Sequence, residues 1–241
     1  MYDSEFVNLK SWKIIACIIT LAGGFQFILL TFIAMFLYPD GYSFTGDYFS
    51  NLGTTINVKT GSPNIIPRIL FLTACVVVGA SLIPFWMVIS TFFTEKKLLK
   101  YISISGSVIG IISSICLMSV GIFAEDTHYF LHSSSAKLFF SFVIIAILIY
   151  SFALLLNSAY HYVYSFIGII FSVSAISMLY LFRYSIMINI IMQKVIVYGY
   201  CAWVTVQISA ILKKLGITFN YKRLMGRPIK KIFFRFKEFV L

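Results

Sequence analysis

The sequence predicts an all-α integral membrane protein: a bundle of six transmembrane helices with both termini in the cytoplasm and a basic amphipathic C-terminal tail. The first of three supporting observations is composition, since 60% of the 241 residues are hydrophobic, 11% are charged and the mean hydropathy is +0.95. A soluble domain carries about 25% charged residues, so this chain has too little polar surface to face water on all sides. The other two observations are the apolar stretches and the placement of basic residues.

Six apolar stretches are long enough to be helical spans, because a bilayer core about 30 Å thick takes about 20 residues to cross. The stretches are continuous rather than alternating, which favours helices, whose backbone groups pair internally. The first stretch, about 25 residues, is too long for the core of a signal peptide, so we expect it to be retained. The spans, within a transmembrane domain over residues 1–212, are predicted at 14–38, 66–93, 101–123, 135–156, 163–182 and 185–212.

Basic residues predict the orientation. One side of the membrane receives two Lys or Arg before the first span, three between the second and third, and nine after the sixth, whereas the other side receives four. Cytoplasmic segments carry the excess of Lys and Arg, so both termini are expected in the cytoplasm. We expect the protein in the cell (plasma) membrane.

Two of the predicted spans carry distinct faces. Small residues allow close helix packing along one side of the third span, at Ser103, Ser107, Gly110, Ser114 and Gly121, with Gly106 beside them. On the sixth span, polar side chains lie within about 40° of one another on a helical projection, and they are Asn189, Gln193, Tyr200 and Gln207. We expect this second stripe to face the bundle interior or a wet cavity.

Lys194 lies about 100° away from Gln193 around the sixth span. A charge at mid-depth costs at least about 2.5 kcal/mol on insertion scales, which makes this lysine a functional candidate. The alternative is that its long side chain snorkels to an interface.

The predicted orientation gathers acidic and histidine side chains in the first and third loops, on the external face. These residues are Asp40, Asp47, Glu125, Asp126, His128 and His132. We expect a polar site facing the lipid headgroups there, with Asp47, Asn51, Asp126 and His132 among its residues.

The C-terminal segment 213–241 carries nine basic residues against one acidic residue. A helix there would place phenylalanines on one side and charged groups on the other, as in helices that lie in the membrane interface. Lys230, Lys231, Arg235 and Lys237 would then contact anionic headgroups. Nucleic acid is not expected as a partner, because interleaved phenylalanines suit lipid and no nucleic-acid-binding motif surrounds them.

Two loop segments resemble those of the DRAM/Sfk-type six-span membrane proteins and of related prokaryotic six-span proteins. The first is Tyr48-Phe49-Ser50-Asn51-Leu52-Gly53-Thr54, and the second runs from Gly121-Ile122-Phe123 to His132 and Ala136. Asn51 stands where that family usually has an acid, and Ala124 where it often has proline. The resemblance implies a lipid-linked role and carries over Ser50, Gly53 and His132 as site residues.

The leading functional hypothesis is a non-catalytic lipid-interacting protein whose partners are membrane lipids, with no cofactor and with homo-oligomers allowed. The first alternative is a zinc-dependent lipid hydrolase or transferase, in which Glu125, His128 and His132 at i, i+3 and i+7 ligate the metal. The second alternative is a transporter or channel that uses the polar stripe and Lys194. Cysteines 17, 75, 116 and 201 lack C-x-x-C spacing, so neither a metal cluster nor a disulfide framework is expected.

Overall fold

The computed structural model describes residues 2–94, 96–158, 160–180 and 186–217, without the side chains of residues 2–9, 178 and 180. Its elements are α1 (Tyr2–Phe36), the short 3-10 helix η1 (Phe49–Gly53), α2 (Ile65–Ser90), α3 (Lys97–Ile122), α4 (Tyr129–Leu155), α5 (Val163–Tyr180) and α6 (Ile186–Lys214). A helix therefore coincides with each apolar stretch. Within the described residues, β-type backbone pairing is limited to one isolated bridge, between Ile56 and Pro63.

Five of these helices are long and apolar enough to cross a membrane, namely Lys10–Phe36 of α1 and all of α2, α3, α4 and α6. The apolar part of α5 that is described, Val163–Ser177, is shorter. The chain is thus an all-helical membrane bundle.

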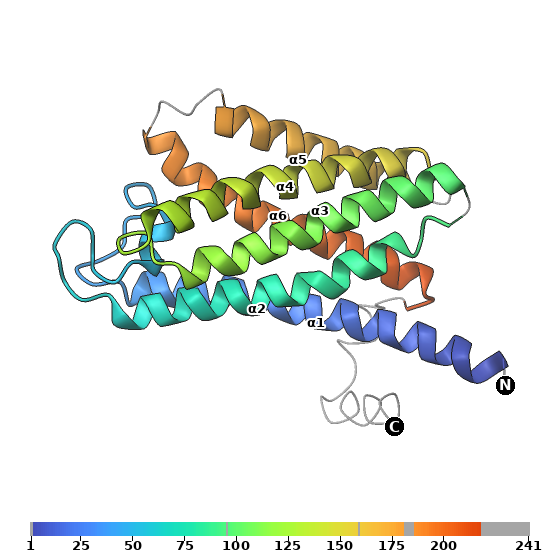
Figure 1. The fold of residues 1–241 in the computed structure, drawn as a ribbon, viewed down its shortest axis with the longest axis horizontal. Helices are drawn as coiled ribbons and strands as arrows, with labels where there is room; N and C mark the ends of the chain where they lie inside the picture. Colours follow the sequence, from blue (N-terminus) through green and yellow to red (C-terminus); the bar gives the residue numbers. More distant parts are fainter. Residues whose placement is uncertain (1, 95, 159, 181–185, 218–241) are drawn as a thin grey trace, which may run out of the picture.

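The helices alternate in direction, so the connections fall at two opposite ends of the bundle (Figure 1). Residues 37–64, which include η1, and residues 123–128 lie at one end, which we call the loop end. The opposite end, which we call the basic end, carries the start of α1, the α2–α3 and α4–α5 connections and the last turn of α6 with Lys213 and Lys214. α1 to α5 each pack against the next helix in the chain, and α6 closes the bundle by contacting both α5 and α1.

The small-residue face of α3 is buried, as predicted. A Cβ atom on Gly110 would lie 2.3 Å from the ring of Trp86 on α2, and one on Gly106 would lie 3.0 Å from the ring of Tyr150 on α4. Hydrogen bonds join the same helices, because the Ser107 hydroxyl donates to the carbonyl of Trp86 and the Tyr150 hydroxyl donates to the carbonyl of Ser103, at 2.8 Å. Close backbone approach therefore fixes α2, α3 and α4 side by side.

α4 begins at Tyr129, before the apolar stretch predicted to start at residue 135. The polar residues Ser133 to Ser135 interrupt the apolar pattern without interrupting the helix. The turn before it closes through a hydrogen bond from the backbone N–H of His128 to the carbonyl of Ala124, at 2.8 Å. His132 therefore lies on the first turn of a helix rather than in a loop.

Candidate functional site

The first loop is folded around one buried amide. The side-chain NH2 group of Asn64, just before α2, donates to the carbonyls of Asn51, Leu52 and Thr54 at 3.0 to 3.3 Å. These bonds fix η1 against the start of α2. A Cβ atom at Gly53 would lie 2.6 Å from the ring of Phe71, so glycine allows η1 to rest directly on α2.

Two carboxylates stabilise the outer part of this loop. Asp47 is 2% exposed; it accepts a hydrogen bond from the backbone N–H of Ser43 at 2.7 Å and pairs with the Lys59 ammonium at 2.7 Å. Asp40 accepts from the hydroxyls of Thr60 and Ser62 at 2.6 and 2.7 Å, and these bonds lower the pKa of its carboxyl. Both carboxylates therefore hold the loop in one shape.

Lys194 of α6 is fully buried, and its side chain binds this loop from the side of the helix bundle. Its ammonium donates to the carbonyls of Phe44 and Asp47 at 2.7 and 2.6 Å, and to Ile190 on its own helix at 3.2 Å. The rings of Tyr42 and Phe44 lie 5.3 and 5.0 Å from the same nitrogen. Carbonyl dipoles and aromatic faces thus replace the water that a snorkelling lysine would reach.

Gln193 makes a second link between α6 and the loop. Its side-chain oxygen accepts a hydrogen bond from the backbone N–H of Phe49 at 3.1 Å. Gln193 and Lys194, which are neighbours on α6, therefore hold η1 and the segment before it over the interior of the bundle. The two residues project from different sides of α6, as the sequence predicted for Lys194 and the polar stripe.

Asp126 joins the third loop to the first. Its carboxylate accepts a hydrogen bond from the backbone N–H of Thr55 at 2.8 Å and a shorter one from the Thr55 hydroxyl. Partial burial opposes ionisation, but these bonds outweigh it and hold the pKa of Asp126 below its usual value.

His132 and Glu125 meet beside this junction. His132 is 3% exposed, and its Nδ1 lies 2.7 Å from the carbonyl oxygen of Phe123. Because a carbonyl oxygen only accepts, Nδ1 carries the proton, and Nε2 is left facing the Glu125 carboxylate at 3.9 Å.

His128 does not join this pair as a third ligand. Its side chain is exposed, its Nδ1 lies 2.9 Å from the Thr127 hydroxyl, and its ring packs against Phe123. The i, i+3, i+7 spacing would place Glu125, His128 and His132 on one face of a helix, but α4 begins only at Tyr129, so Glu125 and His128 are not on that helix. Within the described ranges, no group of three His, Cys, Asp or Glu side chains could hold a metal ion.

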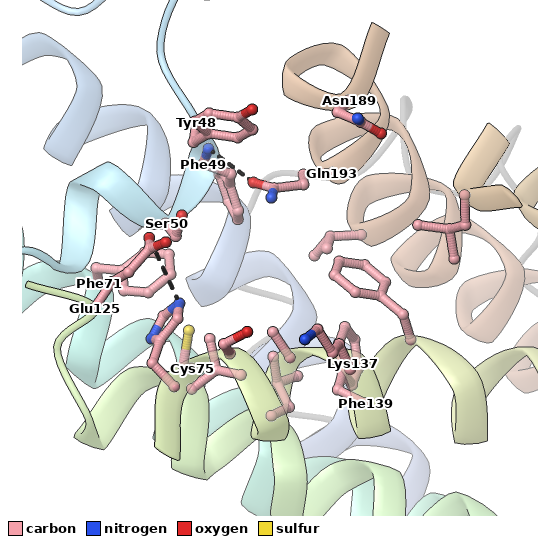
Figure 2. A pocket seen from close by; sticks show the side chains of 18 of the residues that line it. Tyr48, Phe49, Ser50, Phe71, Cys75, Glu125, Lys137, Phe139, Asn189 and Gln193 are labelled. Atoms are coloured by element: carbon pink, nitrogen blue, oxygen red, sulfur yellow. Dashed lines mark hydrogen bonds and ion pairs between the residues drawn. The ribbon is translucent and has the colours of Figure 1, made fainter. Parts of the chain in front are cut away.

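A cavity of about 580 Å³ lies under η1, between α4 and α6 (Figure 2). Its polar side chains belong to η1 and the residue before it, the third loop and the parts of α4 and α6 nearer the loop end: Tyr48, Ser50, Glu125, Tyr129, His132, Ser133, Lys137, Asn189 and Gln193. Its apolar lining comes from η1 and from all the helices: Phe27, Phe49, Phe71, Cys75, Leu117, Val120, Ala136, Phe139, Phe140, Leu179 and Val197. Along α4 and α6, the polar lining residues therefore lie nearer the loop end and the apolar ones lie deeper, apart from Ser141.

The predicted site residues divide between the cavity and its surroundings. Ser50 and His132 line the cavity, whereas Asp47, Asn51, Gly53 and Asp126 hold the first and third loops, which cover the cavity and which we call its roof. Of the α6 stripe, Asn189 and Gln193 line the cavity, and Tyr200 and Gln207 are buried deeper in the bundle. Lys230, Lys231, Arg235 and Lys237 lie outside the described residues.

Lys137 is a cavity residue that the sequence analysis did not select. It projects from the α4 wall, opposite Gln193 (Figure 2). A charge inside the predicted fourth span was the available signal, the same one that drew attention to Lys194 in the sixth span.

The long apolar helices define a polytopic α-helical membrane protein. No protein-family model, no curated protein and no solved structure matches the chain.

Proposed function

We propose that this protein is a non-catalytic lipid-binding protein that takes an amphiphilic lipid into the cavity between α4 and α6. The observation that carries the proposal is the order of the lining along α4 and α6, where His132, Lys137, Asn189 and Gln193 lie nearer the loop end and Phe139, Phe140 and Val197 lie deeper in the bundle. A lipid has the same order from headgroup to acyl chain. The volume lies within the range of about 300–1,000 Å³ that is common for small-molecule sites.

The proposal includes a six-span topology in the plasma membrane, with the loop end outside and both termini inside. Lys96, Lys97, Lys213 and Lys214 gather at the basic end, which supports a cytoplasmic position for it. The resemblance of two loop segments to DRAM/Sfk-type proteins favours a lipid-linked role as well, and η1 and His132 from those segments both border the cavity.

Occupancy of the cavity is tested by filling it. Ala136 lines the cavity from α4, so Ala136→Phe should displace a bound lipid, whereas Ala80→Phe on an exposed position of α2 is the matched control. The full chain and both variants are purified in mild detergent, and co-purifying lipids are quantified by mass spectrometry. We expect a loss of about tenfold in retained lipid, equal to about 1.4 kcal/mol, for Ala136→Phe alone. Equal lipid retention by both variants would overturn the proposal.

A metal-dependent lipid hydrolase or transferase is the second candidate, favoured by the meeting of Glu125 and His132 at the cavity. Elemental analysis of the purified protein, after chelation and zinc re-addition, separates the two. We expect no stoichiometric zinc, because His128 points elsewhere. Stoichiometric zinc that is lost in both His128→Ala and His132→Ala would favour the hydrolase and count against a non-catalytic role.

A further inference from the structure

We infer that the cavity recognises a zwitterionic headgroup with a primary amine and a phosphate, as in phosphoethanolamine lipids. The inference rests on the proposed function and assigns the class of lipid that this site takes. Three features support it: an acceptor pair for an ammonium group, a lysine for a phosphate, and the order of these groups from the loop end inward.

The acceptor pair consists of Glu125 and His132. The bond from Nδ1 of His132 to the Phe123 carbonyl calls for the tautomer that carries its proton on Nδ1, in which Nε2 is an acceptor that faces the Glu125 carboxylate at 3.9 Å. Two acceptors that face each other lack a donor between them. A primary ammonium has three N–H donors and can serve both atoms, whereas a quaternary ammonium has none.

The cation is Lys137, which lines the same cavity from α4. It makes no ion pair or side-chain hydrogen bond with the part of the chain that the structure describes. On the opposite wall, the oxygen of Gln193 is occupied by the backbone of Phe49, which leaves its NH2 group as a donor (Figure 2). An ammonium and an amide N–H on facing walls suit a phosphate.

The order of these groups matches the lipid. α4 runs inward from the loop end, and Lys137 follows His132 by five residues, or about 7.5 Å along the helix axis. The amine site is thus outermost, the phosphate site lies below it, and the apolar lining from Phe139 and Val197 comes last. A phospholipid in the outer leaflet presents its amine, phosphate and acyl chains in the same sequence.

The test is a competition measured by native mass spectrometry on the full chain in detergent. The probes are phosphatidylethanolamine, phosphatidylcholine, phosphatidylglycerol and diacylglycerol with identical acyl chains. We expect phosphatidylethanolamine to bind about tenfold more tightly than phosphatidylcholine. Glu125→Gln should remove that preference, and Lys137→Gln should remove the preference of the phospholipids over diacylglycerol. Lys100→Gln, which changes an exposed lysine at the basic end, should leave both preferences unchanged.

The outcomes separate this inference from the function on which it rests. Equal binding of phosphatidylethanolamine and phosphatidylcholine, with both lost in Ala136→Phe, would overturn the headgroup assignment and leave the lipid-binding function standing. Lipid binding that Ala136→Phe does not alter would overturn both. A preference that persists in both Glu125→Gln and Lys137→Gln would place headgroup recognition elsewhere and also overturn the assignment.

Discussion

Lys194 shows how a single charge can be stable inside a membrane bundle. Its three ammonium protons meet three backbone carbonyls, two from the first loop and one from its own helix. An unpaired charge at mid-depth would cost several kcal/mol, so these contacts offset the burial only while the loop stays in place. The lysine therefore acts on the cavity through the position of its roof.

We expect Lys194→Met to loosen that roof. The carbonyl of Phe44 would lose its donor and that of Asp47 would keep only the Tyr42 hydroxyl at 3.2 Å, and a buried unpaired carbonyl costs about 1–3 kcal/mol. Hydrogen exchange of purified protein should become faster in residues 42–49 and stay unchanged in α2 and α3. The same substitution at exposed Lys100 is the control, and equal exchange in the two variants would show that the roof does not depend on Lys194.

Asp126 gives a pH-dependent prediction at the same scale. Because its folded-state pKa is depressed, its ionised form stabilises the contact to Thr55 above the usual carboxyl pKa of 3.8, and this contribution is lost as pH falls through the lower folded value. At neutral pH, Asp126→Asn should speed proteolysis of the first loop relative to the wild type. That difference should shrink as pH falls below 3.8 and disappear once the pH is below the lower folded-state value; a difference that stays constant through this range would show that ionisation is not its cause.

At the level of helices, α3 is held by contacts that leave no room for added atoms. Gly110 lies against Trp86, and Gly121 lies against Cys75, where a Cβ atom would approach within 2.6 Å. In a membrane, such small residues let neighbouring backbones gain van der Waals contact that lipid tails would otherwise supply.

Gly110→Ala should therefore destabilise the bundle by about 1–3 kcal/mol, as overpacking usually does. Gly24→Ala on α1 is the matched control, because its Cβ atom would meet nothing within 4 Å. Alanine is also the better helix former by about 1 kcal/mol, so the control should be neutral or stabilising. Thermal unfolding in detergent measures both, and equal midpoints would contradict close packing at Gly110.

The helices could be predicted from the sequence because a long, continuous apolar stretch pairs all its backbone groups within a bilayer when it forms a helix. The buried face of α3 followed from residue size and helical period in the same way. The partners of Lys194 could not be predicted, since they come from a loop about 150 residues earlier and are backbone atoms of no particular residue type. For Lys137, the charge inside the predicted fourth span was visible in the sequence, but its place in the cavity depends on how α4 and α6 lie in the bundle.

At the scale of the whole molecule, charge and polarity separate the two ends. Asp40, Asp47, Glu125, Asp126, His128 and His132 lie at the loop end, where hydrogen bonds join the first and third loops, while Lys96, Lys97, Lys213 and Lys214 lie at the basic end. This asymmetry supports the proposed orientation, with the loop end outside the cell.

Cysteine labelling of intact cells tests that orientation. In a background without the four native cysteines, Val58→Cys at the loop end should react with an impermeant maleimide, since Val58 is exposed. Lys97→Cys at the basic end should react only after the membrane is permeabilised. The reverse pattern would invert the topology and move the cavity to the inner leaflet.

The contacts of α6 with the first loop also set an order of assembly. Phe44, Asp47 and Phe49 leave the ribosome early, whereas Gln193 and Lys194, which bind them, follow about 150 residues later. Translation delivers the chain from its N-terminus, so the early loop must wait for the last helix to be inserted. A nascent chain that stops before α6 would lack Gln193 and Lys194, so the first loop would not be held by α6, and the proposed lipid site would be complete only after α6 is inserted.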